Sequence, residues 1–150
     1  MTRDDCSIVS GWVEGERPPG SAGALIHNLD LSAELARPIA RAWVAQGDAS
    51  DELLAYALIW QILDEVELVA LATRPDRRRQ GAARTLLLAA FDAVREAGAV
   101  RVLLEVAASN GPARNLYEAL GFRVFNRRPG YYAATGDDAL EMELSLASPA

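Results

Sequence analysis

The sequence predicts a mixed α/β domain built on a mainly antiparallel sheet. Three short apolar runs, 39–46, 52–63 and 66–73, follow one another through links too short to hold a crossover helix, so antiparallel pairing is expected. A helical pattern separates the third run from a fourth at 100–106, and strands joined through a helix are usually parallel. We therefore expect a mixed sheet with two central parallel strands and helices on both faces.

Length and composition favour one globular domain over residues 1–150. The chain has 150 residues, of which 51% are hydrophobic, enough to build a buried core. No apolar run has membrane-spanning length, and the N-terminus, with Asp4 and Asp5, does not resemble a signal peptide. The single cysteine, Cys6, cannot form an internal disulfide. We expect a cytoplasmic protein with no membrane partner.

Charge excludes several classes of function. The net charge of −6 argues against a general nucleic-acid binder and suits a basic partner. All 15 basic residues are arginine, which excludes a Schiff-base lysine and the lysine of a P-loop. His27 is the only histidine, so no metal-binding constellation is predicted.

The first 37 residues carry weak signals. Residues 6–14 favour a strand, 15–23 a loop rich in proline and glycine, and 24–29 and 32–37 two short helices. Pro38 is expected to end the second helix.

The remaining elements follow from periodicity and turn residues. Strands are predicted at the apolar runs, with turns at 47–51 and at Asp64 and Glu65. Apolar residues at helical spacing predict helices over about 79–97 and over 111–120. The last strands are placed at 122–125 and 139–146, joined through the segment 127–132 and a turn at 136–138.

The turn after the third strand has the features of an anion site. Pro75 and Asp76 stop the strand, and Gly81 lies in a tight basic turn at the start of the long helix, where backbone N–H groups lack partners and the helix dipole favours negative charge. The arginines that flank it are Arg74, Arg77, Arg78 and Arg79. We expect a phosphorylated ligand, such as a pyrophosphate. The alternative is an ordinary turn with a solvated basic face. Neither Gly-x-Gly-x-x-Gly nor a P-loop ending occurs in the chain.

Three motifs carry a resemblance to a known family. They are Arg78-Arg79-Gln80-Gly81-Ala82-Ala83, Leu104-Glu105-Val106-Ala107-Ala108-Ser109-Asn110 and Leu116-Tyr117-Glu118-Ala119-Leu120-Gly121-Phe122. Over about residues 38–146, this pattern resembles the GNAT acetyltransferase superfamily and its RimI-type branch, which acetylates the N-terminal alanine of a ribosomal protein. The resemblance implies acetyl-CoA as co-substrate, and two central strands that splay apart to admit it.

The resemblance also implies roles for individual residues. Glu105 would be the general base, acting through water, and Tyr117 would protonate the leaving thiolate. Arg127, Tyr131 and Tyr132 would lie on the peptide-binding side. The residues that would contact acetyl-CoA are Ala70, Leu71, Ala72, Arg78, Arg79, Gln80, Gly81, Ala82, Ala83, Arg84 and Asn110.

Taken alone, these residues leave other interpretations open. Glu105 could stand at a strand end and reach solvent or an arginine, because a buried unpaired carboxylate is costly. Tyr117 lies in an apolar helical stripe, which is the pattern of core packing. Asn110 is also a candidate helix N-cap.

The chain departs from the RimI pattern in two places. Ala107 stands where these enzymes often have arginine, and residues 1–37 lack a recognisable peptide-binding Trp-Ser element. The resemblance implies acetyl transfer to the N-terminal amine, with alanine first, of a ribosomal protein. The chemistry fits this acceptor, since an α-amine (pKa about 7.7–8.0) is already partly neutral at pH 7. The alternatives are a GNAT enzyme acting on a small-molecule amine and a non-catalytic acyl-CoA-binding regulatory module.

Overall fold

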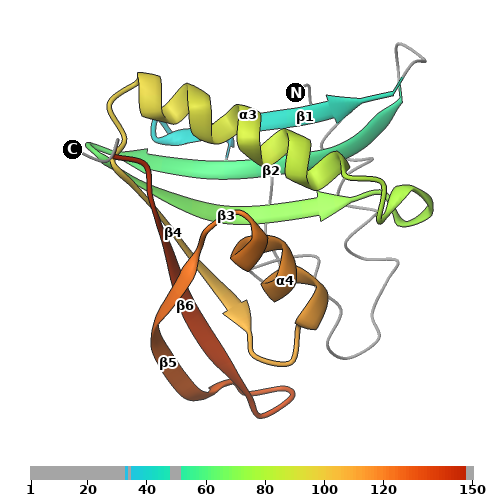
Figure 1. The fold of residues 1–150 in the computed structure, drawn as a ribbon, viewed down its shortest axis with the longest axis vertical. Helices are drawn as coiled ribbons and strands as arrows, with labels where there is room; N and C mark the ends of the chain where they lie inside the picture. Colours follow the sequence, from blue (N-terminus) through green and yellow to red (C-terminus); the bar gives the residue numbers. More distant parts are fainter. Residues whose placement is uncertain (1–32, 34, 48–51, 148–150) are drawn as a thin grey trace.

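The computed structural model describes residues 33, 35–47 and 52–147, which form a six-stranded mixed sheet with two longer helices (Figure 1). In chain order the elements are β1 (Ala40–Gln46), β2 (Leu53–Ile62), β3 (Glu65–Thr73), the short 3-10 helix η1 (Pro75–Arg77), α3 (Ala82–Glu96), β4 (Arg101–Ala107), α4 (Gly111–Ala119), β5 (Arg123–Tyr132) and β6 (Asp137–Ser145). The strand order is β1-β2-β3-β4-β6-β5.

The pairing confirms the predicted sheet. Strands β1, β2 and β3 are successive antiparallel neighbours, and β3 pairs in parallel with β4. Strand β6 inserts between β4 and β5 and is antiparallel to both. The only parallel pair among the described strands is therefore the pair joined through α3, as expected for a helical crossover.

The parallel strands separate after a short contact. Only Glu65–Glu67 of β3 pair with Arg101–Leu103 of β4. Just beyond, the β2–β3 register places Leu58 opposite Ala70 but Ile59 opposite Leu68, so Val69 is an extra, bulged residue. A bulge bends the strand that carries it. From Ala70 to Thr73, the backbone of β3 therefore pairs with β2 alone among the described strands.

Two apolar clusters cover the two faces of the sheet. The larger one joins alternate residues of the central strands, such as Val102, Leu104 and Val106, to the inward stripe of α3 and to Tyr117 of α4. The stripe comprises Leu86, Leu87, Ala90, Phe91 and Val94, which confirms the predicted amphipathic helix. On the other face, a smaller cluster contains Tyr56, Leu58, Val69, Ala70 and Ala72, with Leu35 packed against it. Leu35 has helical backbone, so helical residues contact both faces.

Two predicted boundaries were wrong. The long helix begins at Ala82 rather than near Arg79, because Arg79 (φ 62°) and Gly81 (φ 81°) have left-handed backbone that a helix cannot continue. The segment 127–132, predicted as a link, belongs to β5, which runs to Tyr132. As an edge strand with a register break between Arg128 and Tyr132, β5 tolerates Pro129 and Gly130.

Most predictions for the N-terminal segment fall outside the described residues. These are the strand at 6–14, the loop at 15–23 and the helix at 24–29; of the helix at 32–37, Ala33 and Leu35 are described and are helical. Of the turn at 47–51, only Gly47 is described. None of the helices in the described ranges is long and apolar enough to cross a membrane.

Candidate active site

The predicted anion turn presents a helix start whose backbone donors have no side-chain cap. Gly81 is the N-cap of α3, no side chain caps the helix, and the first turn contains no acidic residue. An added Cβ at Gly81 would meet no atom within 4 Å, so the backbone there faces open space. The N–H groups of Ala82, Ala83 and Arg84 are therefore suited to an anion. Residues 78–81 are exposed, and Arg79 and Gln80 lie on this open turn.

The arginines around this turn divide into two groups. Arg74 and Arg77 donate to the same oxygen of Glu52, at 2.8 and 2.9 Å, and Arg74 also binds Asp76 at 2.6 Å. Those two cations are neutralised within the protein and brace the end of β3 against β2. Arg78 and Arg79 are exposed on the turn itself. The sequence alone did not reveal this division, because Glu52 lies in a distant segment.

The segment Ala70–Ala72 lies where β3 leaves β4. Its backbone pairs on one side with β2, through Leu58, Ala57 and Tyr56. Its other edge has no strand partner among the described residues, because the β3–β4 pairing ends at Glu67. The N–H and C=O groups on this edge, which lack a strand partner among the described residues, can bind an extended ligand as an added strand does. The side chains of this segment pack into the protein, since Ala70 is fully buried and Leu71 packs on the main core.

Glu105 lies on the face of β4 that points away from the main core. Its neighbours Leu104 and Val106 are buried, whereas Glu105 is half-buried. Its cross-strand partner on β6 is another carboxylate, Glu141. On β3, Glu67 occupies the last paired position before the strands separate. Desolvation by the surrounding protein raises the pKa of Glu67, and the nearby Glu105 charge raises it further.

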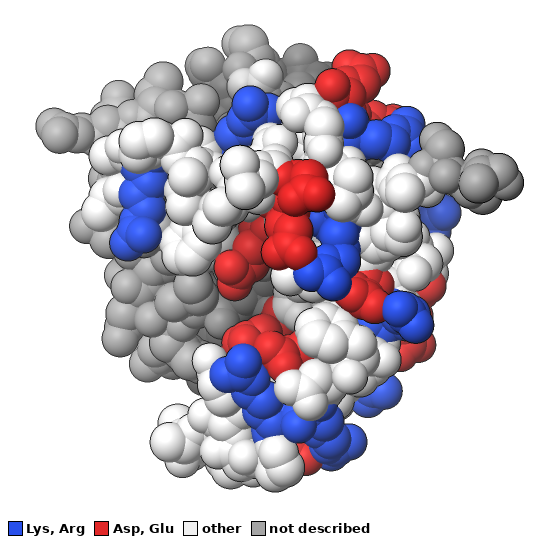
Figure 2. All heavy atoms as spheres, turned by 90° about the vertical axis from the view of Figure 1, so that its left-hand side faces the viewer, with Lys and Arg blue, Asp and Glu red and all other residues white. Residues whose placement is uncertain are grey.

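A tyrosine and an arginine of β5 face this group of carboxylates. The charge of Glu105 raises the pKa of Tyr131, and desolvation raises it further. Arg128 lies 5.5 Å from the centre of the Tyr131 ring and donates to Glu141 at 3.1 Å. Figure 2 shows basic and acidic side chains interleaved along the middle of one face of the molecule. Glu105 lies within β4 rather than at its end, half-buried and opposite Glu141 of β6.

Tyr117 is a core residue of α4. Only 3% of its surface is exposed, and its ring lies 5.7 Å from that of Phe122 at a tilt of 59°. Burial raises the pKa of its hydroxyl well above the usual range of tyrosine. The interpretation as core packing is therefore correct. It is compatible with a chemical role, since such a hydroxyl keeps its proton at neutral pH.

The remaining predicted residues lie at two separate places. Asn110 is buried and caps α4, its side-chain oxygen accepting from the Ala113 N–H at 3.2 Å, which confirms the N-cap interpretation. Arg127 donates to Asp138 at 2.6 Å within the β5–β6 hairpin. Tyr132 packs edge-on against Tyr131, and burial followed by the charge of Glu105 raises its pKa to about 12.

A family model described as the acetyltransferase (GNAT) family matches residues 9–122, most of the chain. The chain belongs to the GNAT acetyltransferase family. It is 40% identical to the ribosomal protein bS18-alanine N-acetyltransferase of Salmonella typhimurium (strain LT2) over 100 residues, 65% of this chain and 68% of that one. A Bacillus subtilis (strain 168) protein, provisionally named for the same activity, is 34% identical over 128 residues, 85% of this chain and 80% of its own.

A solved structure supports the similarity to the bS18-alanine N-acetyltransferases. The crystal structure of the ribosomal-protein-S18-alanine N-acetyltransferase from Escherichia coli superposes with a TM-score of 0.72 at 31% identity, covering 79% of this chain and 77% of that one. The predicted fold and the resemblance to RimI-type enzymes are confirmed. The chain is an acyltransferase by family, and GNAT acetyltransferases use acetyl-CoA.

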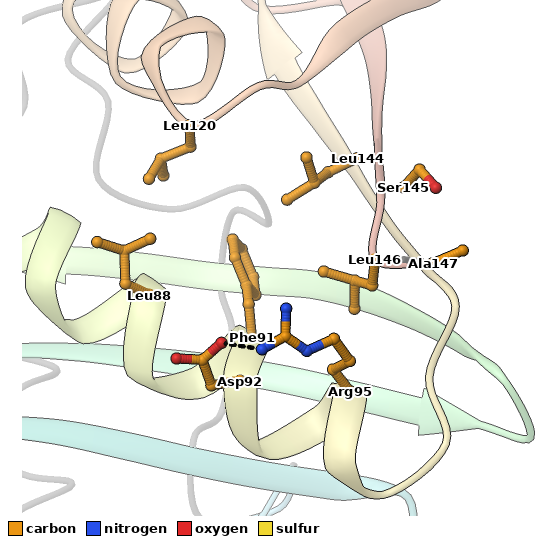
Figure 3. Close-up of a pocket in the computed structure, with 9 residues that line it drawn as sticks. All are labelled: Leu88, Phe91, Asp92, Arg95, Leu120, Leu144, Ser145, Leu146 and Ala147. Atoms are coloured by element: carbon orange, nitrogen blue, oxygen red, sulfur yellow. Dashed lines mark hydrogen bonds and ion pairs between the residues drawn. The ribbon is translucent and has the colours of Figure 1, made fainter. Parts of the chain in front are cut away.

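The GNAT domain also has a cavity apart from these residues (Figure 3). Its volume is about 290 Å³, and it lies between α3, the end of α4 and the end of β6. The lining residues are Leu88, Phe91, Asp92, Arg95, Leu120, Leu144, Ser145, Leu146 and Ala147. None of them is a predicted site residue. Within the described ranges, no group of three or more His, Cys, Asp or Glu is arranged to hold a metal.

Sequence reasoning did not place Glu67 or Glu141 in this site, and it placed Arg128 only with Arg127 near the expected peptide-binding side. Glu67 was visible as a polar residue in an apolar run, and Arg128 as one of two adjacent arginines. Only the pairing of β3, β4, β6 and β5 brings them beside Glu105. Glu141 carried no signal, because a polar residue in an alternating antiparallel strand is ordinary.

Proposed function

We propose that this GNAT domain transfers an acetyl group from acetyl-CoA to the N-terminal amine of a ribosomal protein whose first residue is alanine. The observation that carries the proposal is Glu105, a half-buried carboxylate on β4 beside the point where β3 and β4 separate. The names of the relatives favour a ribosomal protein as acceptor. The proposal includes cytoplasmic location and a single domain over residues 1–150, with 1–37 on the substrate side.

The residues present fit the co-substrate, which supplies an acetyl thioester when bound. The start of α3 offers uncapped N–H groups to the pyrophosphate, with Arg78, Arg79 and Gln80 exposed beside it. The free edge at Ala70–Ala72 offers N–H and C=O groups to the extended arm, and an N–H donor there would stabilise negative charge on the acetyl oxygen. Asn110 would contribute from the start of α4 while it caps that helix.

Two side chains would move the protons. Glu105 accepts, through water, the proton that the amine loses as the new C–N bond forms. Tyr117 donates its hydroxyl proton to the sulfur as the C–S bond breaks, and both groups then exchange with solvent to recover their starting states. No covalent enzyme intermediate is needed, because the amine attacks the thioester directly.

The surroundings of Glu105 suit a cationic amine. Glu67 and Glu141 lie on neighbouring strands of the same region, and the whole chain carries a net charge of −6. Such a field attracts an ammonium group and a basic ribosomal protein. Arg127, Tyr131 and Tyr132 would contact the peptide from the β5–β6 hairpin.

The acceptor is tested by acetyl-CoA turnover, followed as thiol release. One arm uses a peptide with the alanine-first terminus of the host ribosomal protein, and a second arm uses the same peptide with its α-amine blocked. A third arm contains small polyamines and amino sugars. We expect turnover on the free peptide alone. Turnover confined to the small amines would refute the ribosomal acceptor, and binding of acetyl-CoA without any turnover would support a regulatory module.

Gly81→Ala should weaken acetyl-CoA binding. The new Cβ would stand at the helix start, where the pyrophosphate is proposed to approach, and alanine at a φ of 81° costs about 1–2 kcal/mol of folding free energy. We expect at least a roughly tenfold rise in the dissociation constant, equivalent to about 1.4 kcal/mol, measured by titration calorimetry.

Gly98→Ala is the matched control for that substitution. Gly98 (φ 98°) follows the other end of α3, and an added Cβ there also meets nothing within 4 Å. The two variants should lose similar stability, but only Gly81→Ala should lose affinity. Equal affinities in both would exclude a phosphate contact at Gly81.

A further inference from the structure

The turn between β4 and α4, Ala108–Asn110, has a partner for every backbone N–H and C=O group. Four of these groups bind backbone neighbours at 2.8–3.0 Å; the neighbours belong to Ala107, Gly111, Arg114 and Asp138. The last two groups, the Ser109 N–H and the Ala108 C=O, bind side chains from two different elements. A loop of three residues is thus held as completely as a strand or a helix.

The first of these side chains is Asp137, at the start of β6. A single oxygen, Oδ2, accepts from the Ser109 N–H at 3.2 Å and also from the Ser109 hydroxyl. These contacts lower the pKa of Asp137, the hydroxyl hydrogen bond most, so the carboxylate is ionised at neutral pH. Hydrogen bonds to an ionised acceptor are stronger than those between neutral groups. Asp137 therefore fixes the turn from the side of the β5–β6 hairpin.

The second side chain is Arg114, in the first turn of α4. Its Nη1 donates to the Ala108 carbonyl at 3.0 Å, and its Nη2 lies 3.8 Å from Glu118. Its Nε is buried without a hydrogen-bond partner in the described part of the chain. Burying an unpaired donor costs free energy, which an arginine extended into solvent would avoid. The guanidinium is therefore directed at the turn, which it holds from the side of the helix.

The side chain that this turn presents is that of Asn110. Only 7% of its surface is exposed, and its Oδ1 caps α4 by accepting from the Ala113 N–H at 3.2 Å. A cap requires an acceptor, so the other end of the amide is the NH₂ donor. Among the described residues this Nδ2 group has no hydrogen-bond partner, and it is not fully enclosed. Asn110 therefore has one committed oxygen and one donor left for a ligand.

We propose that Asp137, acting through Ser109, and Arg114 are positioning residues that fix the Ala108–Asn110 turn, so that the Asn110 amide is already placed to donate to acetyl-CoA. This inference rests on the proposed role of Asn110 as a contact of the co-substrate and adds two residues that act through it. A donor that is fixed in advance binds more tightly, because no conformational freedom is lost when the ligand arrives.

The affinity for acetyl-CoA, measured by titration calorimetry on the full chain, tests this inference. Asp137→Ala and Arg114→Met should each raise the dissociation constant by roughly fivefold or more, the effect of about one hydrogen bond. Ser109→Ala should weaken binding in the same direction, whereas Ser109→Thr keeps the hydroxyl and should restore wild-type affinity. Because the hydroxyl acts through Asp137, Ser109→Ala should add nothing in the Asp137→Ala background.

Two matched controls carry the same changes of charge. Asp138→Ala removes the neighbouring carboxylate of β6, which accepts from Arg127 at 2.6 Å and from the Gly130 N–H at 2.8 Å, within the hairpin. Arg95→Met removes a helical arginine that pairs with Asp92 at 2.8 Å on α3. Both should keep wild-type affinity for acetyl-CoA. An equal loss in the controls would assign the effect to charge or stability and overturn the inference.

Two further measurements need no catalysis. In ¹⁵N-labelled protein, the Asn110 side-chain NH₂ signals are assigned by their absence in Asn110→Ser, which keeps a cap acceptor. Saturating acetyl-CoA should shift these signals in the wild type, and signals that do not move would overturn the inference. The thermal midpoint of each variant is measured alongside. A lower midpoint with an unchanged dissociation constant would make Asp137 and Arg114 purely structural and overturn the positioning role.

The outcomes separate this inference from the proposed function. If the wild type binds acetyl-CoA but does not acetylate the alanine-first peptide, the ribosomal acceptor fails, and the affinities still decide the positioning role. If the peptide is acetylated and all variants bind acetyl-CoA equally, the positioning role fails alone.

Discussion

Replacing Glu105 with glutamine is expected to lower kcat for peptide acetylation by roughly 10²–10⁴-fold, the usual contribution of a positioned general base. Glutamine has the same shape but cannot accept the proton that the amine loses. Affinity for acetyl-CoA should be kept, because the proposed contacts of the co-substrate lie at β3 and the start of α3. Steady-state kinetics with calorimetric binding checks both quantities.

The deficit should depend on pH in a defined direction. An α-amine has a pKa of about 7.7–8.0, so above pH 8 most of the substrate is already neutral. The activity of Glu105→Gln relative to wild type should then rise between pH 7 and pH 9. A deficit that does not change with pH would mean that Glu105 orients groups rather than accepting a proton.

Glu65→Gln provides the control for that experiment. Glu65 is exposed at the start of β3 and forms an ion pair with Arg101. Glu65 stands opposite Arg101 of β4, in the part of β3 that is still paired with β4. It lies two residues before Glu67, the last paired residue. Its loss should leave kcat within twofold of wild type. An equal fall in both variants would indicate a general effect of charge on the sheet.

Replacing Tyr117 with phenylalanine should lower kcat by roughly 10²-fold or more. The hydroxyl alone is removed, and the ring contact with Phe122 at 5.7 Å is retained, so the thermal midpoint should change little. Burial raises the pKa of Tyr117, which means that the group carries its proton across the working pH range. No fall in rate from ionisation of Tyr117 is therefore expected between pH 6 and pH 9.

The raised pKa of Tyr117 also limits its strength as an acid toward the leaving thiolate. A free thiol has a pKa of about 8.5, so a buried phenol is the weaker acid and full transfer to a free thiolate is uphill. Its contribution belongs in the transition state, where a hydrogen bond to the departing sulfur is strongest. An unchanged kcat in Tyr117→Phe, with an intact fold, would leave Tyr117 as a core residue only.

Much of the fold was predictable because local signals agreed with one another. Short links between apolar runs required antiparallel neighbours, and the helical stripe at Leu86, Leu87, Ala90 and Val94 required a crossover to a parallel strand. The helix start was misplaced because Arg79, Gln80 and Gly81 are compatible with helix by type, and only their backbone angles exclude it. The length of β5 was missed because Pro129 and Gly130 are turn signals that an edge strand tolerates.

The sequence by itself determined the family, the acyltransferase class and the identity of the candidate groups Gly81, Glu105 and Tyr117, because these lie in contiguous motifs. The tertiary structure decided which side chains surround them. Strand pairing places Glu141 opposite Glu105 and Arg128 on Glu141, and the bulge at Val69 lies just beyond the last paired residue of β3 and β4. These relations join residues far apart in the chain, and charge and burial act through space rather than along the backbone. No local pattern could therefore predict which carboxylate pairs with an arginine of a neighbouring strand.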